Sequence, residues 1–509
     1  MLAKVLKTNN SNQLTEIFFK NIVVFLQEVI TYSAIFLIII FLISTLLGAL
    51  NFKNKLFNVV FKLVKVLNIL IISVIFLAVF TKFNLFLWFY KEYSTAICLS
   101  SNLLLNLNYI PEIGLVNFNG SILSDVVVLL ALSSGLVCLY LLGEKNLTKN
   151  ISNLSFFAIF FVAILIMVYT VNLLVMFITF ELLFLPTLYF IYSHGYVERV
   201  DKTLFILLYW TLCGAFLVLC TLAYLYFKYK TLNIYILASL KYSNMESILI
   251  FLAIFIGFGI KVPVAPFHYW LTKIHVEAPA GFSIFLSGFL VKAALYCFYS
   301  FNLILAKPYL TRIIIIVAFY GIAESSIKMW NQTDFKKLIA YATIQEMNLI
   351  LYLLAGSQNL IDYGLILFIL IHGWLSTLMF FLVDIIQKKT NTRNIVELGG
   401  IAYTSAIIKI IIWFILLLFS GFPLTIKFMI EWQVLGSLIM CSPNVQLIIF
   451  LIIAVFGVMG FAKQMIIILY GSPRRESTVN HLLSKRDKNL FYFIIFILIY
   501  LNLLNYMLT

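Results

Sequence analysis

Long apolar runs separated by short polar segments dominate the chain. An α-helix needs about 20 apolar residues to cross a bilayer core of about 30 Å, and fourteen runs are candidates for such helices. The runs lie at about 25–50, 57–88, 121–143, 152–171, 173–194, 203–226, 248–263, 280–301, 312–328, 338–355, 363–386, 400–440, 447–470 and 490–508. This pattern predicts an all-α polytopic membrane protein with about 14 transmembrane helices.

Lysine and proline interrupt the pattern most clearly between the seventh and eighth runs. Lys261 ends the seventh run, Pro263 and Pro266 follow it, and Lys292 lies inside the eighth run. A lysine at membrane depth costs several kcal/mol unless it faces a partner or a wet cavity, so it is a candidate functional residue. Prolines free backbone carbonyls and are tolerated beside such cavities. The pattern predicts a broken helix followed by a lysine-bearing helix.

Single charges in other runs are further candidates. Glu181 is the only charged residue between Ile151 and His194. Most of its neighbours are apolar for about ten residues on each side, so an interfacial position is a poor explanation. Glu324, Asp384, Lys409 and Lys463 lie within or near runs, and we expect them to be interfacial or to face other subunits.

Composition excludes a soluble globule. Hydrophobic residues make up 63% of the 509 residues and charged residues 11%, whereas about half of a soluble domain is apolar. The first run is too long for the core of a removable signal peptide, so we expect it to remain as a span. The abundance of Phe and Tyr, 49 and 28 residues, is typical of an AT-rich genome and favours a protein encoded in the mitochondrion.

The basic residues are distributed unevenly between alternate loops. Loops after the odd-numbered runs hold about twice as many lysines and arginines as the other loops and the leader together. The positive-inside rule therefore places the odd-numbered loops in the matrix and both termini on the opposite side. The net charge of +15 is explained by attraction to the anionic phospholipids of the membrane, and no nucleic-acid partner is expected.

Motifs for redox cofactors and metals are missing from the sequence. The six cysteines show no C-x-x-C spacing, and neither a G-x-G-x-x-G nor a phosphate-binding lysine loop occurs. We therefore place no metal, nicotinamide, flavin or ATP site on this chain.

Three blocks carry a resemblance to a known family. They are KVPVAPFHYWLTKIHVEAPAG from Lys261 to Gly281, NQTDFKKLIAYATIQEM from Asn331 to Met347, and HGWLSTLMFFLVDIIQKKTNTRNIVELGG from His372 to Gly400. Together they resemble the antiporter-like, proton-translocating membrane subunits of NADH:ubiquinone oxidoreductase, or respiratory complex I. HVEAP is most similar to the chain 4 branch. The resemblance is strong from about Phe177 to Glu431.

The resemblance implies a proton route through the membrane. In such subunits the glutamate matching Glu181 pairs with the lysine matching Lys261, and Lys292 is the next station. The implied relays are His268, His275 and His372, and Glu431 is the implied exit-side group.

The chain departs from this pattern at three positions. Lys427 stands where relatives usually have a neutral residue, and an i,i+4 pair with Glu431 is expected to hold that carboxylate ionised. Leu424 replaces the second proline of the usual pair at the break. Glu346 stands where many relatives have a histidine, so a carboxylate is expected to act as the relay there. On the sequence alone, Glu346→Gln is expected to impair pumping and Glu346→His to retain most of it.

The resemblance also implies an internal symmetry. Residues 1–150 would form three N-terminal helices, which match the family poorly. Two inverted five-helix repeats would follow at 151–301 and 312–470, with breaks in helices 7 and 12. A loop in the matrix and a last helix would occupy 471–509.

The implied function is that of a proton-pumping subunit in the mitochondrial inner membrane. NADH, FMN, the iron-sulfur clusters and ubiquinone would all bind to other subunits, and two sister antiporter-like subunits would flank this chain. Two alternatives remain at this point, a subunit of a multi-subunit cation/proton antiporter and a purely structural spacer.

Overall fold

The computed structural model describes residues 79, 81, 122–141, 147–195, 200–302, 308–356, 363–441, 444–472 and 484–508. The first two expected spans, 25–50 and 57–88, therefore lie almost wholly outside the described residues. The chain divides into two compact units, one made of residues 1–133 and 143–186 and the other of residues 134–142 and 187–509. Each unit is described by itself.

The helices described in the first unit are α4 (Leu147–Tyr169), α5 (Leu173–Leu182), the part of α3 (Ile122–Leu141) up to Ser133 and the start of α6 (Phe184–His194) up to Pro186. Helices α4 and α5 pack against each other. A buried hydrogen bond joins α4 to α3, since the Tyr169 hydroxyl donates to Asp125 Oδ1 at 3.0 Å. Asn172 caps α5, because its Oδ1 accepts from the backbone N–H of Leu174.

The expected span 173–194 is interrupted once. Helix α5 ends at Leu182 and α6 (Phe184–His194) begins two residues later. Pro186 has no N–H to donate to the carbonyl of Leu182, four residues earlier. The N–H of Leu183 bonds to Phe180, which tightens the chain locally at this point.

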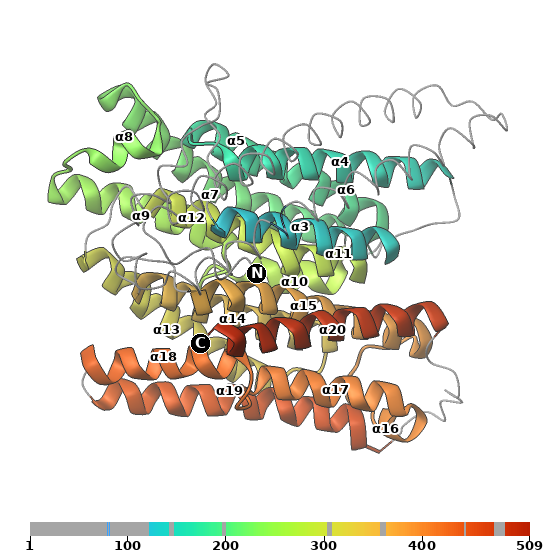
Figure 1. Cartoon of the computed structure of the whole chain (residues 1–509). Coiled ribbons are helices and arrows are strands. Elements are labelled where there is room, and N and C mark those ends of the chain that lie inside the picture. The colour runs from blue at the N-terminus through green and yellow to red at the C-terminus, as the bar shows by residue number, and fades with distance from the viewer. Residues whose placement is uncertain are drawn as a thin grey trace, which may run out of the picture. The chain divides into compact units, whose positions relative to one another are not determined.

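The second unit is an assembly of helices whose long axes run roughly parallel in Figure 1. Besides most of α6, its helices are α7 (Val200–Tyr229), α8 (Ile234–Ser239), α9 (Asn244–Lys261), α10 (Tyr269–Glu277), α11 (Ala280–Phe285), the π-helix η2 (Leu286–Leu290), α12 (Val291–Asn302), α13 (Pro308–Trp330), α14 (Phe335–Gly356), α15 (Tyr363–Thr390), α16 (Ile401–Thr404), α17 (Ala406–Phe419), α18 (Ile426–Cys441), α19 (Asn444–Tyr470) and α20 (Lys485–Leu508).

These helices separate into an inner and an outer set. Helix α15 contacts α11, η2, α14, α17, α18 and α20. The apolar windows of the inner spans Ala280–Asn302 and Gly364–Thr390 are entirely buried. Only about a third of the corresponding window is buried in the outer helices α7, α13 and α19. The outer helices thus present apolar side chains outward, as lipid contact requires.

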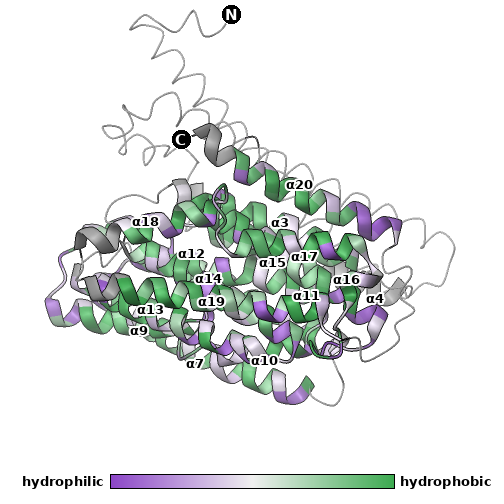
Figure 2. Ribbon diagram, turned by 90° about the horizontal axis from the view of Figure 1, so that it is seen from below, coloured by the Kyte–Doolittle hydropathy of each residue, from purple (hydrophilic) through white to green (hydrophobic). Residues whose placement is uncertain are grey.

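Hydropathy agrees with a membrane location. Among the described residues, nine helices are long and apolar enough to cross a membrane. Figure 2 shows hydrophobic residues along most of the helices of the second unit and hydrophilic residues in the first turn of α20. The structure is helical, as the sequence predicts. The total of fourteen spans and the inverted repeats remain predictions.

Helices α7 and α9 approach closely at two glycines. A Cβ at Gly214 would lie 2.7 Å from the carbonyl oxygen of Gly257, and a Cβ at Gly257 would lie 2.6 Å from Val218 Cγ2. Neither position has room for a larger side chain. Small residues allow close backbone contact between membrane helices, where packing rather than the hydrophobic effect drives association.

The chain leaves helical geometry at both interruptions that the sequence indicates. Helix α9 ends at Lys261, and the chain resumes helical structure at Tyr269. The expected run 400–440 contains α16, α17 and α18, with its main break between Phe419 and Ile426. Both breaks lie in the second unit, and each is flanked by a buried lysine.

Candidate functional site

The first break is stabilised by side chains that bind the freed backbone. Trp270 Nε1 donates to the carbonyl of Ile260 at 2.6 Å, one residue before the helix ends. The N–H of Val264 bonds to the carbonyl of Gly259, whose partner four residues on, Pro263, has no N–H. Lys261 is 1% exposed. The helix end therefore holds a buried ammonium without leaving these backbone carbonyls unsatisfied.

Lys292 lies at the start of α12, directly after the π-helix η2. Its side chain is 1% exposed, and its Nζ donates to the carbonyl of Ser287 inside that π-helix. A π-turn widens the helix by one residue and occurs frequently at functional sites. Here it gives the ammonium a backbone acceptor five residues earlier in the same span.

His275 is fully buried on α10, the short helix between two spans. Its ring stacks on Phe380 with centroids 4.7 Å apart, and neither ring nitrogen has a hydrogen-bond partner within the described residues. Burial, with the ammonium groups of Lys336 and Lys292 acting in the same direction, lowers the pKa of His275 to about 3. The imidazole is therefore neutral at physiological pH.

The three signature blocks meet at the C-terminal end of α10. Lys336 Nζ donates to the carbonyl of Ala278 at 2.9 Å, and Arg393 Nη1 donates to the carbonyl of Val276 at 2.5 Å. Arg393 Nε lies 3.3 Å from Asp334 Oδ2. Cations at a helix C-terminus satisfy its free carbonyls and complement its dipole. The second and third blocks thus hold the HVEAP segment in place.

Lys336 corrects one expectation from the sequence. Its position just before an apolar run places it among the basic residues of a matrix loop. The structure instead puts it in the first turn of α14 at 1% exposure. The pattern of apolar runs could not reveal this, because the carbonyl that binds Lys336 lies 58 residues earlier in the chain.

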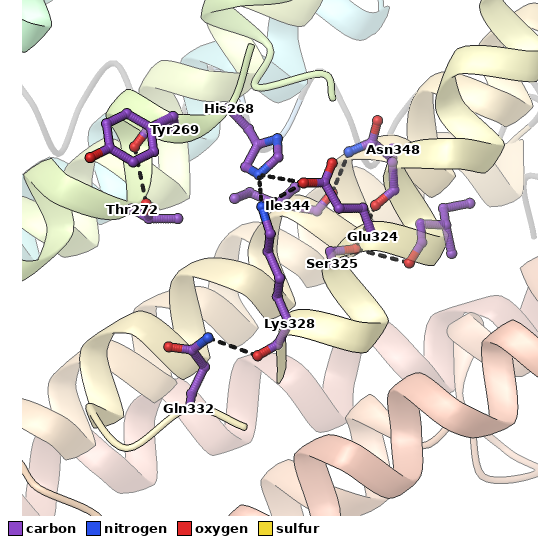
Figure 3. Close-up of polar contacts among 11 residues, drawn as sticks. His268, Tyr269, Thr272, Glu324, Ser325, Lys328, Gln332, Ile344 and Asn348 are labelled. Atoms are coloured by element: carbon purple, nitrogen blue, oxygen red, sulfur yellow. Dashed lines mark hydrogen bonds and ion pairs between the residues drawn. The ribbon is translucent and has the colours of Figure 1, made fainter. Parts of the chain in front are cut away.

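A second group surrounds His268 and includes two residues that the sequence reasoning missed. Glu324 Oε1 lies 2.5 Å from Lys328 Nζ, one turn later on α13, and 3.8 Å from His268 Nε2. Lys328 Nζ lies 3.4 Å from the same imidazole nitrogen. Figure 3 shows the lysine reaching up from its helix to both the carboxylate and the imidazole. Glu324 therefore has a lysine and a histidine as neighbours within this chain.

The charge state of His268 reflects these neighbours. Burial lowers the pKa of His268, the Glu324 carboxylate opposes that effect, and the Lys328 ammonium adds to it. The net shift is downward, so the neutral ring predominates at physiological pH.

The second break, between α17 and α18, is built around Lys427. Its Nζ donates to the carbonyl of Phe419, the last residue of α17, at 2.6 Å and lies 3.8 Å from the centroid of that residue's ring. The backbone N–H of Ile426 donates to Asn502 Oδ1 of α20 at 2.9 Å. The groups freed by the break are thus taken by side chains, although Leu424 replaces the usual second proline.

Lys427 also makes an ion pair that the sequence did not predict. The expected partner was Glu431 on the same helix. In the structure Lys427 Nζ lies 3.2 Å from Glu346 Oε1 on α14. The partner is 81 residues away in the chain. Glu431 still interacts electrostatically with Lys427, but helical spacing could not reveal the direct ion pair with Glu346.

Glu346 lies inside the bundle between three elements. Its side chain is 3% exposed, and its second oxygen, Oε2, lies 3.7 Å from His372 Nε2 on α15. Lys292 and Glu431 are both close enough to interact with it electrostatically. The structure therefore brings together Lys292, Glu346, His372, Lys427 and Glu431.

Glu431 lies against the backbone of the second break. A Cβ at Gly421 would lie 2.7 Å from Glu431 Oε2, and Gly421 has a φ of +66°. Unlike Glu346, Glu431 is partly exposed. An ionisable group at the less buried end of the cluster is suitably placed to exchange protons with water.

The remaining charged candidates fall into two groups. Glu181 belongs to the other compact unit, so its pairing with Lys261 remains a prediction. Asp384 pairs with Lys388 at 2.6 Å, while Lys409 and Lys463 lie over the rings of Tyr470 and Trp330. In the described part of the chain, no three His, Cys, Asp or Glu side chains are placed to hold a metal ion.

The family described as "NADH:quinone oxidoreductase/Mrp antiporter, TM" matches residues 170–457, more than half of the chain. The chain belongs to this family. The match includes both helix breaks and every residue of the proton route that the resemblance implies, and it confirms the resemblance carried by the three signature blocks.

Named relatives in the NADH:quinone oxidoreductase/Mrp antiporter family agree with this assignment. NADH-ubiquinone oxidoreductase chain 4 of Paramecium tetraurelia is 33% identical over 396 residues, which is 77% of this chain and 83% of the relative. Chain 4 of Marchantia polymorpha is 30% identical over 272 residues, or 52% of this chain and 54% of the relative.

Solved structures of this family share the fold. A chain of respiratory complex I from Thermus thermophilus aligns with a TM-score of 0.69 at 16% identity, covering 93% of this chain and 97% of that chain. A chain of the Mrp complex from Dietzia sp. aligns with a TM-score of 0.67 at 16% identity, covering 88% and 82%.

Proposed function

We propose that this chain is the chain 4 type, proton-translocating membrane subunit of an NADH:ubiquinone oxidoreductase. The observation that carries the proposal is the buried cluster of Lys292, Glu346, His372 and Lys427, with Glu431 at its edge. Ionisable groups buried within membrane spans are rare and mark ion or proton pathways. The relatives named NADH-ubiquinone oxidoreductase chain 4 support this complex over the other complexes of the wider family.

The buried groups supply the chemistry that proton transfer needs. Imidazole, carboxylate and ammonium groups exchange protons, and opposite charges close together keep each other ionised in a low dielectric. In our proposal a change in the charge of the Glu181 and Lys261 pair alters the proton affinity of Lys292. The proton then passes through the cluster around Glu346 and leaves by way of Glu431. His268 and His275 follow Lys261 in the chain and are further relay candidates in this proposal.

The redox reaction belongs to other subunits in this proposal. NADH, FMN, iron-sulfur clusters and ubiquinone would bind elsewhere in the complex, and two sister antiporter-like subunits would flank this chain in the mitochondrial inner membrane. The related alternative is a subunit of a cation/proton antiporter, which the likeness to the Mrp complex keeps open. Co-purification with a flavin and iron-sulfur enzyme would separate the two.

Replacement of Lys292 by alanine tests the proposal. Lys292→Ala removes the ammonium at the centre of the cluster, so proton pumping and coupled quinone reduction per assembled complex should fall while most of the complex still assembles. Both rates would be measured in sealed membrane vesicles, with complex yield determined by native gel electrophoresis. Normal pumping in this variant would contradict the proposal and favour a purely structural role.

A further inference from the structure

Two charges that the resemblance does not account for meet inside the bundle. Glu346 on α14 and Lys427 on α18 form an ion pair at 3.2 Å, with side chains 3% and 5% exposed. Either charge alone at this depth would be strongly unfavourable, because removing an ion from water costs several kcal/mol. The two residues therefore form one unit.

Lys427 is held in place independently of Glu346. The carbonyl of Phe419 accepts from its Nζ at 2.6 Å, and the ring of the same residue lies under the ammonium. A helix C-terminus carries partial negative charge, which favours a cation there. The ammonium is therefore a fixed positive charge at the helix break and can act on the carboxylate beside it.

Glu346 is placed between the other ionisable groups of the cluster. The charged and titratable side chains that face it are Lys427 of α18, His372 of α15, Lys292 of α12 and Glu431 of α18. The cluster therefore contains two ammonium groups and a second carboxyl group around the Glu346 side chain. Lys427 is the cation that contacts Glu346 directly.

We propose that Lys427 is a positioning residue of the proton route, which holds Glu346 as a carboxylate able to accept a proton. A donor on the side of Lys292 and His372 gives its proton to Glu346. Glu346 becomes a carboxylate again when that proton passes toward Glu431. This inference rests on the proposed function and adds to it a residue at which the chain departs from the pattern of the family.

The replacement Lys427→Met tests this role. Without the ammonium, the buried carboxyl retains its proton, so most pumping per assembled complex should be lost. The limb of the pH profile on which pumping rises with pH should also move to higher pH, because a close opposite charge that favours the carboxylate has been removed. An unchanged profile, even with reduced complex yield, would show that Lys427 is only structural and would overturn the proposal.

Infrared difference spectroscopy of the purified complex gives a second readout. Lys427→Met should show an added absorption from a protonated carboxyl group, and the double variant Lys427→Met with Glu346→Gln should lack it. Lys427→Arg keeps the positive charge and should keep the wild-type pH profile. Absence of the added carboxyl absorption in Lys427→Met would contradict the proposed role of the ammonium.

If Lys427→Met fails to assemble, a second test replaces Glu346 by histidine and Lys427 by a neutral residue, which are the residue types expected from the family pattern. The sequence alone predicts that Glu346→His retains most pumping. The structure changes this expectation, because Lys427 would then be buried beside an imidazole with no carboxylate at 3.2 Å. Glu346→His should therefore impair pumping, and adding Lys427→Asn should restore it. Normal pumping by Glu346→His alone would overturn the inference.

The Lys292→Ala variant separates this inference from the proposed function. If Lys292→Ala fails to pump while Lys427→Met pumps with an unchanged pH profile, the proton route stands and only the role of Lys427 is wrong. If Lys292→Ala pumps normally, the proposed function itself is wrong.

Discussion

The protonation of His268 depends on two opposite charges on α13. Lys328 lowers the pKa of the imidazole and Glu324 raises it, in addition to the lowering caused by burial. Their atoms lie 3.4 Å and 3.8 Å from Nε2. Substituting the two side chains separately should therefore shift the pKa of His268 in opposite directions.

Substitutions at these two positions should shift the pH dependence of pumping with opposite sign. Lys328→Met removes a cation, so the pKa of His268 rises and the ring becomes protonated at higher pH. Glu324→Gln removes the favourable carboxylate, so the ring stays neutral to lower pH. The comparison would use pumping per complex between about pH 5 and 8, where histidines usually titrate. Shifts in the same direction in both variants would rule out titration of His268 as their cause.

The sequence identifies most of the titratable groups but fewer of their partners. Intramembrane charge and family resemblance single out Lys261, Lys292, Glu346 and Glu431, because charges are rare in apolar runs. Neighbours within one helix, such as Glu324 and Lys328, were available from i,i+4 spacing and were missed because both lie near a span end. The Glu346 partner could not be found in this way, since α14 and α18 meet only through tertiary packing.

The backbone geometry of the second helix break restricts which residue can occupy position 421. Gly421 has a left-handed φ of +66°, and its missing Cβ leaves room for the Glu431 carboxylate. A residue other than glycine would meet both a backbone penalty and a steric contact with the Glu431 carboxylate.

Gly421→Ala should therefore damage both assembly and pumping. The left-handed conformation costs a non-glycine residue about 1–2 kcal/mol, and the new methyl group would lie 2.7 Å from Glu431 Oε2 unless the carboxylate moved. Complex yield and pumping per complex would be measured. Gly436→Ala on α18 is the matched control, since a Cβ there meets nothing within 4 Å. Equal effects of the two substitutions would contradict the argument.

Helix boundaries and the two main helix breaks of the second unit follow from the sequence. Apolar runs predict α13, α14 and α15 to within a few residues, because length and hydropathy determine a membrane span. They do not predict the π-helix at Leu286–Leu290 or the interruption at Leu183. The backbone at these places is set by local hydrogen bonds, which leave no periodic signal.

For the whole molecule, the distribution of lysine and arginine gives a testable orientation. The segment from Arg474 to Lys488 should face the positive-inside compartment and Thr509 the opposite one. Thiol labelling of cysteines introduced at each site, in oriented membrane vesicles, would show the two sides. Labelling of both from one side would mean that α20 does not span and that the count of fourteen is wrong. The burial of Lys336 removes one charge from the comparison but leaves the excess of basic residues on the same side.

The separation of an inner from an outer set of helices has a consequence for how such a chain diverges over time. Outer faces of α7, α13 and α19 need only remain apolar, so exchanges among Leu, Ile, Val and Phe there leave the contact with lipid almost unchanged. Positions on α12, α14 and α15 are constrained by buried charges and close packing. We therefore expect substitutions to be tolerated more readily on the outer faces than on the inner helices, while the fold itself is retained, as it is in solved structures at 16% identity.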